Sequence, residues 1–226
     1  MDNPSIIFDV EYAPLSIGVL ALDAVSVSKS TSEFEVYEQQ VFQEIRNRTT
    51  LDELRDDEIF RSYRDLYWTH GMDPTKLRVS SEALVRRIVN GHNLWRVSNL
   101  VDTANLASAY HSLPVGLIDT SSLSGDLQVR IARKDEVFER IGGKKITCRG
   151  REIVLADDEK IVCFGFATHD SHPTRVTMDS TNVLLLIYGA PLVSREQMNS
   201  AMKITQDMIN KWIDCTISSS DVFTTE

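Results

Sequence analysis

The sequence predicts an α+β fold in a single domain, and three observations lead to that prediction. Apolar residues recur at helical spacing from about residue 34 to 110, strand-like runs separated by turn residues follow from 115 to 188, and one more helical pattern comes after them. The 226 residues contain no repeat and no low-complexity linker. A chain of this length can bury roughly 70% of its unfolded surface in one core. Helices and strands segregated around one core are typical of an α+β domain.

The N-terminal part is expected to combine short strands with an acidic helix. Residues 1–28 predict short extended segments, with strand-like runs at 17–20 and 25–27. Apolar residues between Phe34 and Ile45 repeat at helical spacing on an acidic background. A second helix is predicted from about Asp57 to Trp68, because Gly71, Asp73 and Pro74 break the pattern after it.

Two further helices are predicted from their capping residues. The segment 80–90 begins with Ser80 or Ser81 as the expected N-cap and ends at Asn90–Gly91, a common C-terminal pair. The next helix runs from about Asn99 to Tyr110, with Ser98 as its cap.

The second half of the chain predicts strands and one last helix. Apolar runs bounded by Ser-Gly, Gly-Gly and Asp-rich turns predict strands, and a continuous run before Gly189 and Pro191 predicts a central one. Ser194 and Gln197 have capping-box spacing, so the last helix begins there, and its methionine stripe is expected to pack in the core. Residues 218–226 are expected to form a frayed tail. The predicted strands are Val115–Ile118, Leu127–Ile131, Ile153–Leu155, Ile161–Phe166 and Val183–Tyr188.

Charge is distributed unevenly along the chain. The net charge of −9 argues against a general nucleic-acid binder, because phosphate contacts need Lys and Arg. Nine acids and three bases lie in 33–58, whereas 128–151 holds eight bases and three acids and 76–96 holds five bases and one acid. The two basic segments are candidate nucleic-acid surfaces, although solvated faces would look the same.

Composition and motifs also restrict the class of protein. Three cysteines, Cys148, Cys163 and Cys215, form no CxxC pair and no disulfide framework, which fits a reducing cytoplasm. The segment Met1–Glu11 has no basic start, and the longest apolar run is far shorter than the ~20 residues of a membrane helix. Without a nucleophile elbow, a phosphate-cradling loop or a zinc signature, we expect no cofactor and no metal.

Two polar clusters sit at predicted helix starts. Free amide groups at Ser80–Ser81–Glu82 suit a phosphate or a developing oxyanion, although simple capping with a Glu82–Arg86 surface pair explains the same residues. Three polar side chains spaced by three lie on one helix face and suit a water or a ribose hydroxyl, unless they satisfy the backbone at the helix start. They are Asn99, Asp102 and Asn105.

A third polar cluster follows an apolar strand and spans Thr168–Arg175. His169 or Asp170 there could serve as a general acid or base. A metal held by His169, Asp170 and His172 is the alternative, but a metal needs three or four ligands in fixed geometry.

These segments together resemble the editing domain of the bacterial-type phenylalanyl-tRNA synthetase beta subunit, which that subunit's third and fourth domains form, and its free-standing versions. The match is an ordered series over about residues 60–190, within a domain completed by 1–60, a C-terminal helix at 191–217 and the tail. The matching words are Ser80–Leu84 with Arg86–Arg87, Asn99–Asp102 with Asn105, Leu113–Gly116 with Asp119, Gly125–Leu127, Ile153–Asp158, Asp170–Ser171, Thr174, Val176–Thr177 and Thr181–Val183.

The resemblance implies a fold in β/α/β layers with a cleft for the aminoacylated 3′ end of tRNA, and hydrolysis of the ester of a misplaced amino acid. It implies that the Ser80–Glu82 helix start and Asn99 position ester and water, and that His169 and Asp170 contact the amino acid, next to Ser171 and Thr174. Thr168–His169 replaces the Gly-Gly of the synthetases and breaks the Trp/Arg pattern of the free-standing forms. Phosphates would be met by Arg86, Arg87, Lys144, Lys145, Arg149 and Arg151.

Three functions are therefore compared. The leading one is a trans-acting aminoacyl-tRNA deacylase, not itself a synthetase, whose partners are tRNA and a synthetase or another protein. The second is a binding module for RNA or a partner that has kept the fold without the hydrolysis, which the −9 charge and the altered Thr168–His169 favour. The third is a hydrolase of small esters or amides with a metal at the third cluster.

Overall fold

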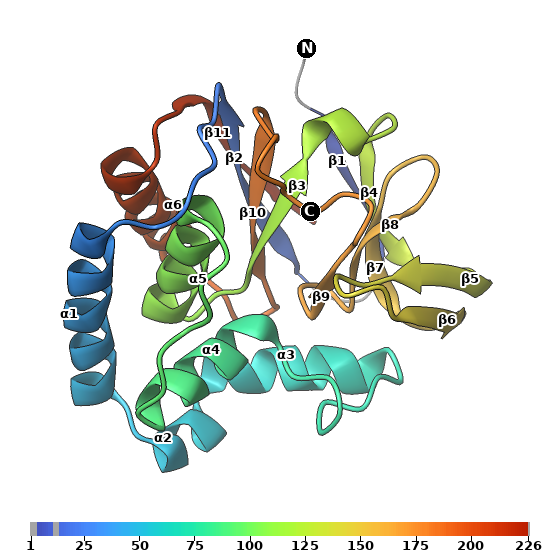
Figure 1. Ribbon diagram of the computed structural model, residues 1–226. Helices are drawn as coiled ribbons and strands as arrows, with labels where there is room; N and C mark the ends of the chain where they lie inside the picture. The colour runs from blue at the N-terminus through green and yellow to red at the C-terminus, as the bar shows by residue number, and fades with distance from the viewer. Residues whose placement is uncertain (1–3, 11–13, 226) are drawn as a thin grey trace.

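The computed structural model describes residues 4–10 and 14–225 and shows two β-sheets packed face to face, with helices outside one sheet and across one end of both (Figure 1). The predicted α+β class in a single domain is confirmed. Parts of the expected N-terminal segments and tail, residues 1–3, 11–13 and 226, lie outside the described residues. The helices are α1 (Ser32–Arg48), α2 (Leu51–Asp56), α3 (Glu58–Thr69), α4 (Ser80–Val89), α5 (Asn99–His111) and α6 (Arg195–Trp212).

The strands form two large sheets and a separate hairpin. Strand β1 pairs with β4 in parallel, and every other pair described is antiparallel. The first sheet has the order β1 (Ile6–Asp9), β4 (Leu127–Ile131), β7 (Ile153–Ala156), β8 (Ile161–Phe164) and β9 (His169–Asp170). The second has the order β11 (Thr216–Thr224), β2 (Ser16–Asp23), β10 (Val183–Gly189) and β3 (Val115–Asp119), and the hairpin is β5 (Lys134–Glu139) with β6 (Lys145–Arg149). A short 3-10 turn, η1 (Thr120–Ser122), follows β3.

The central sheet strands are buried on both faces. On β2, Val19 and Ala21 pack toward the first sheet, whereas Leu20 and Leu22 pack against the outer helices. All seven residues of β10 are buried, which confirms that its continuous apolar run forms a central strand.

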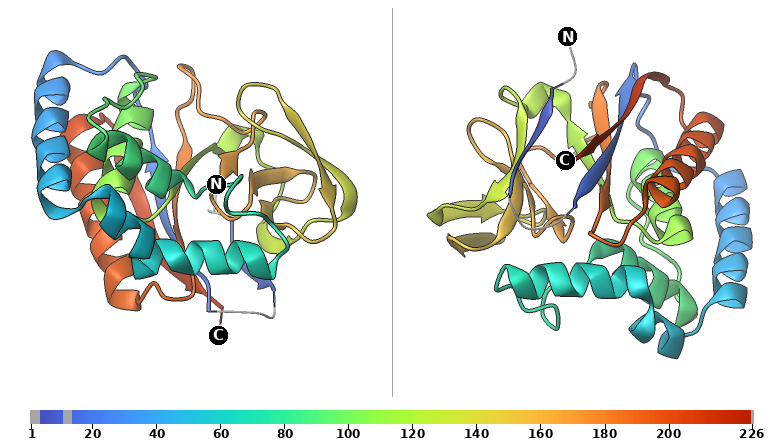
Figure 2. Two further views of the ribbon diagram at one scale, coloured as in Figure 1. Left: turned by 90° about the horizontal axis from the view of Figure 1, so that it is seen from below. Right: turned by 180° about the vertical axis from the view of Figure 1, so that it is seen from behind.

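The layers follow a different order from the β/α/β order that the resemblance implies. The two sheets lie next to each other, α5 and α6 cover the outer face of the β2–β10 sheet, and α1 lies outside them (Figure 2). The alternation along β2 causes this order, because one face of the strand meets the first sheet and the other meets the helices.

Most predicted helix starts are confirmed, and one is wrong. Ser98 caps α5, and Ser194 with Gln197 forms the capping box of α6. The N-cap of α4 is Val79, which makes no side-chain cap. Ser80 and Ser81 are the first two residues of the helix itself, so neither occupies the N-cap position.

Other differences come from tertiary contacts. Residues 25–27 are irregular, and in place of a tail from residue 218 the chain forms strand β11 on the edge next to β2. The strand predicted to reach Phe166 ends at Phe164, because a left-handed turn follows. Helix α2 and the β5–β6 hairpin were not predicted. None of the helices described is long and apolar enough to cross a bilayer.

A buried ion pair joins α1 to the chain that leads into α5. Glu38 on α1 is fully buried, and both its carboxylate oxygens accept hydrogen bonds from the Arg96 guanidinium, at 2.7 and 2.6 Å. Charge-assisted paired bonds of this kind are strong, and removing one partner leaves the other without its counter-charge.

We therefore predict that Glu38→Gln lowers the free energy of unfolding by about 2 kcal/mol. The matched control is Glu35→Gln, because Glu35 is exposed and only 3.6 Å from the same guanidinium, and it should change stability by less than about 0.5 kcal/mol. Chemical denaturation measures both. Equal effects of the two variants would contradict the prediction.

Candidate functional site

A cluster of polar side chains lies where the two sheets meet. Asp170 on β9 stands opposite Cys163 on β8, and Tyr188 on β10 approaches from the other sheet. Gly116 on β3 leaves room for them: a Cβ there would lie 3.0 Å from the Asp170 Oδ1 and 3.3 Å from the Tyr188 hydroxyl. The backbone N–H of Leu117 and the Cys163 thiol hydrogen-bond to the Asp170 carboxyl. We call Asp170, Cys163 and Tyr188 the seam cluster.

Burial controls the ionisation of the seam cluster. It raises the pKa of Asp170 to about 7, although hydrogen bonds from Leu117 and Cys163 oppose the shift. Burial also raises the pKa of the Cys163 thiol and the Tyr188 phenol. Asp170 as a residue is half-buried at the edge of the first sheet, but its carboxyl group is turned inward against β3 and is desolvated there. Such a group can accept or donate a proton at physiological pH.

A strained turn connects β8 to β9. Gly165, Phe166 and Ala167 all have positive φ, of 72°, 45° and 80°, and only glycine adopts this conformation without strain. The Ala167 N–H donates to the Cys163 sulfur over 3.3 Å, and the Thr168 hydroxyl donates to the Tyr67 hydroxyl over 2.9 Å. The turn thus fixes β9 relative to β8 and to α3.

His169 lies next to Asp170, and its pKa is shifted in the opposite direction. Burial and the Arg140 charge lower the pKa of His169, so its imidazole is neutral at pH 7. Ser171 and Thr174, also expected at this site, are buried. The Ser171 N–H donates to the Val162 carbonyl, and the Thr174 carbonyl accepts from the Asp119 N–H.

The described structure does not support a metal ion bound by His169, Asp170 and His172, the alternative considered from the sequence. Within residues 4–10 and 14–225, no three His, Cys, Asp or Glu side chains are grouped so that they could hold a metal ion. His169, Asp170 and His172 therefore do not converge.

The predicted polar face of α5 holds neighbouring chain in place. The Asn99 amide oxygen accepts from the Ser28 N–H at 2.9 Å, and its amide nitrogen donates to the Ser26 carbonyl at 3.0 Å. The buried Asp102 carboxylate accepts from the Val97 N–H and from the Ser30 hydroxyl. Asn105 is half-buried on the same helix. These contacts fasten segment 26–30 to the start of α5, so the backbone-satisfying alternative describes Asn99 and Asp102.

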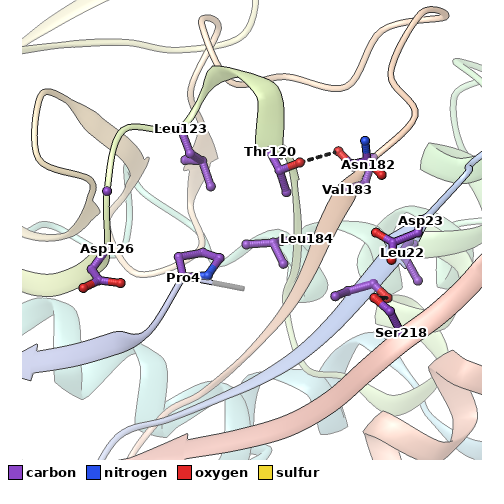
Figure 3. A pocket seen from close by; sticks show the side chains of 12 residues that line it. Pro4, Leu22, Asp23, Thr120, Leu123, Asp126, Asn182, Val183, Leu184 and Ser218 are labelled. Atoms are coloured by element: carbon purple, nitrogen blue, oxygen red, sulfur yellow. Dashed lines mark hydrogen bonds between the residues drawn. The ribbon is translucent and has the colours of Figure 1, made fainter. Parts of the chain in front are cut away.

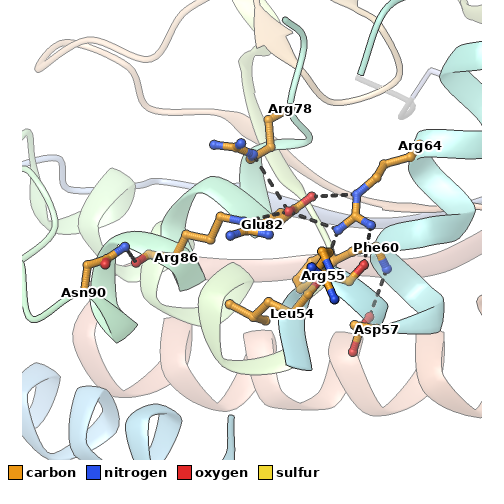
Figure 4. Close-up of polar contacts among 9 residues, drawn as sticks. All are labelled: Leu54, Arg55, Asp57, Phe60, Arg64, Arg78, Glu82, Arg86 and Asn90. Carbon is orange, nitrogen blue, oxygen red and sulfur yellow. Dashed lines mark hydrogen bonds and ion pairs between the residues drawn. The ribbon is translucent and has the colours of Figure 1, made fainter. Parts of the chain in front are cut away.

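Glu82 is occupied by arginines (Figure 4). Its buried carboxylate lies 2.7 Å from the Arg86 Nε, 3.1 Å from an Arg64 nitrogen and 3.8 Å from the Arg78 Nε. Its oxygens accept hydrogen bonds from Arg64 and Arg86, so this carboxylate is engaged within the protein. Ser80 donates its N–H to the Ala167 carbonyl, so this helix start touches the strained turn.

The structure thus separates the candidate residues. His169 and Asp170 lie where the two sheets meet. The Ser80–Glu82 helix start contacts the turn before β9, through the bond from the Ser80 N–H to the Ala167 carbonyl. Asn99 and Asp102 lie at the N-terminal end of α5, away from β3. Cys163, Tyr188 and Gly116 were missed by sequence reasoning. No signal in the sequence pointed to Cys163, because its pairing with Asp170 depends on the short strand β9, which was not predicted.

A pocket of about 790 Å³ opens between the sheets at the end of β3 away from Gly116 (Figure 3). Polar residues of its lining come from β2, η1, β11 and the residues just before β4 and β10, and apolar ones come from β2, β10 and the segment after η1. Thr120 and Asn182 are joined across it, because the Thr120 hydroxyl donates to the Asn182 carbonyl at 3.2 Å. The lining includes Leu22, Asp23, Thr120, Asp126, Asn182 and Leu184.

The predicted phosphate-binding residues form two groups. Arg86 and Arg87 lie half-buried on α4. The others are exposed on or beside the β5–β6 hairpin, which projects from the body of the protein (Figure 1). They are Lys144, Lys145, Arg149 and Arg151.

Comparison with known proteins places these features in a family. The B3/4 domain family model matches residues 62–212. The phenylalanine–tRNA ligase beta subunit of Fusobacterium nucleatum subsp. nucleatum is 30% identical over 87 residues, which are 38% of this chain and 11% of that protein. That of Protochlamydia amoebophila is 27% identical over 167 residues, 72% of this chain and 20% of that protein.

A solved structure is also similar: an N-terminal fragment of the phenylalanyl-tRNA synthetase beta subunit from Pyrococcus horikoshii. It has a TM-score of 0.47 at 12% identity, and the match covers 99% of this chain and 54% of that one. The matches span a fifth or less of the two curated relatives. Since the family model covers more than half of the chain, from α3 through α6, the chain belongs to the B3/4 domain family, the family found in the phenylalanyl-tRNA synthetase beta subunit.

Proposed function

We propose that this domain hydrolyses the ester bond of mischarged aminoacyl-tRNA, with the seam cluster as its reactive centre. The observation that carries the proposal is the Asp170 carboxyl beside Cys163 and Tyr188 where the two sheets meet, whose pKa is about 7 and which lies within the family match. Family membership supports a tRNA-directed role, and a carboxyl poised at neutral pH supplies proton transfer where an activated ester needs little else.

In the proposed reaction, the Asp170 carboxylate accepts a proton from water as the water oxygen attacks the ester carbonyl. The tetrahedral intermediate then breaks its bond to the ribose oxygen, which takes the proton from Asp170. The products are a free amino acid and a tRNA with a free terminal hydroxyl. In this proposal neutral His169, next to Asp170, contacts the amino acid, which is the role that the resemblance suggests. No covalent enzyme intermediate forms.

The basic hairpin is proposed to guide the tRNA. In an acidic protein with a net charge of −9, the exposed cations of the hairpin form one of the few surfaces that attract phosphate. Because these contacts are solvent-exposed, tRNA binding should weaken steeply with salt.

A non-catalytic module for binding tRNA or a partner protein is the second candidate, and one observation favours it. Glu82, Asn99 and Asp102, expected to act on the substrate, are all engaged in contacts within the protein. A domain whose polar residues are used for structure can keep its surface without hydrolysis.

The first prediction concerns hydrolysis itself. A panel of correctly and wrongly charged tRNAs should reveal one or a few species that the protein deacylates. Asp170→Asn should lower that rate at least about 100-fold, because the amide cannot accept the proton. Asn99→Ala serves as a comparison, because Asn99 lies at the start of α5. This variant should lower the deacylation rate by a smaller factor than Asp170→Asn. Hydrolysis of none of the species by the folded protein would favour the binding module.

The pH dependence follows from the raised pKa of Asp170. Since the ionised carboxylate is the active form, the rate after subtraction of protein-free hydrolysis should rise about tenfold between pH 6 and pH 8, and level off above pH 8. Direct attack by hydroxide would instead raise the rate about 100-fold over the same interval without levelling off. A rate that falls with rising pH would contradict the role of Asp170.

Charge reversal in the β5–β6 hairpin tests whether this hairpin binds tRNA. Lys144→Glu combined with Lys145→Glu should weaken tRNA binding and flatten its dependence on salt concentration, measured by fluorescence anisotropy between 50 and 300 mM salt, roughly the range over which phosphate contacts are screened. Lys203→Glu on α6 is the control, because Lys203 is exposed but lies outside both basic segments. Unchanged binding across salt would exclude the hairpin from the interface.

A further inference from the structure

Three arginines from three places in the chain converge on one carboxylate. Arg64 comes from α3, Arg78 from the loop before α4 and Arg86 from α4, and all three point toward Glu82 (Figure 4). The Glu82 side chain is 4% exposed, whereas the three arginine side chains are 24%, 50% and 25% exposed. The carboxylate therefore lies beneath, with the guanidinium groups toward solvent. We call Arg64, Arg78 and Arg86 the arginine cluster.

The charges of the arginine cluster do not cancel. Three positive charges meet one negative charge, and in the described part of the chain no other carboxylate lies within 4.0 Å of these guanidinium groups. Two positive charges are thus left without a counter-charge on the surface of an acidic protein. Holding like charges this close is unfavourable unless an anion neutralises them.

The cluster is rigid on one side and open on the other. Arg64 donates to the backbone carbonyls of Leu54 and Arg55 at the end of α2, at 3.0 and 2.7 Å, which fixes its guanidinium. Within the described residues, the contact that Arg78 makes with a carboxylate is the long one to Glu82, at 3.8 Å, and Arg78 is the most exposed of the three. Its free donors are available to a ligand. One guanidinium fixed by carbonyls beside another with unused donors suits a phosphate, which offers several acceptor oxygens.

An aromatic ring in the loop between α4 and α5 distinguishes nucleic acid from a simple anion. Arg87, the neighbour of Arg86 on α4, lies over the Trp95 ring with 4.1 Å between the guanidinium carbon and the ring centre. Trp95 is 57% exposed. Exposed aromatic rings next to arginines are the elements that bind unpaired bases and their phosphates together.

We propose that the arginine cluster binds a backbone phosphate of RNA, with Glu82 as the anchor that orients the guanidinium groups. The cluster is connected to the reactive centre, because the Ser80 N–H at the start of α4 donates to the Ala167 carbonyl in the turn that leads to Asp170. A strand held there would be fixed close to the seam cluster. The identification of the anion as tRNA phosphate rests on the function proposed above.

The test measures binding of an uncharged, fluorescein-labelled tRNA transcript, so that hydrolysis plays no part. Arg78→Ala should weaken binding about fivefold at 0.15 M salt and lower the slope of log affinity against log salt by about 0.9, the effect of one lost phosphate contact. Arg78→Lys should retain most of the slope, because the charge remains. Arg55→Ala is the matched control: Arg55 is 74% exposed and adjacent, and only its backbone carbonyl contacts Arg64.

Each outcome decides the proposal. A loss with Arg78→Ala, and none with Arg55→Ala, at unchanged melting temperature supports the phosphate site. Equal binding by Arg78→Ala and the unaltered protein, or no tRNA binding by the unaltered protein, overturns it. Binding of a phosphopeptide but not of tRNA would overturn it in favour of a protein partner. Arg78-dependent binding without deacylation of any charged tRNA would keep the phosphate site and remove the proposed hydrolysis.

Discussion

The two-sided burial of β10 is the constraint on which the rest of the structure depends. Its seven residues have no exposed side, since β2 and β3 pair with its edges and both faces are covered. One face meets the first sheet and the other meets α5 and α6. The strand therefore sets the distance between the layers, and Tyr188 near its end carries this geometry into the seam cluster.

The chemistry of the seam cluster follows from that packing. A carboxyl group at a sheet edge would ordinarily be solvated, but β9 is held between β8 and β3, and the dehydration raises the pKa of Asp170. The strained turn at Phe166–Ala167 keeps β9 in this position, and its conformational cost is offset by contacts to Cys163 and α3. Strain and desolvation in one place are typical of functional sites.

Charge is distributed unevenly over the molecule, with acidic residues concentrated in α1 and α2 and basic residues in the β5–β6 hairpin. The acidic residues of α1 and α2 lie at the opposite side from the β5–β6 hairpin (Figure 1). The arginine cluster adds a second positive surface beside α4. An unequal distribution of charge of this kind favours some orientations over others when a charged partner approaches.

Local signals in the sequence determined much of the fold. The spacing of apolar residues located α1, α3 and α6, the Ser194–Gln197 box located the start of α6, and the apolar run of β10 indicated a central strand, because these patterns depend only on neighbouring residues. The tertiary structure decided the rest. It turned the expected tail into β11 because β2 offered an unpaired edge, moved Glu82 into a cluster with Arg64, 18 residues away, and placed Tyr188 beside Asp170. Such contacts join residues far apart in sequence, and no local pattern encodes them.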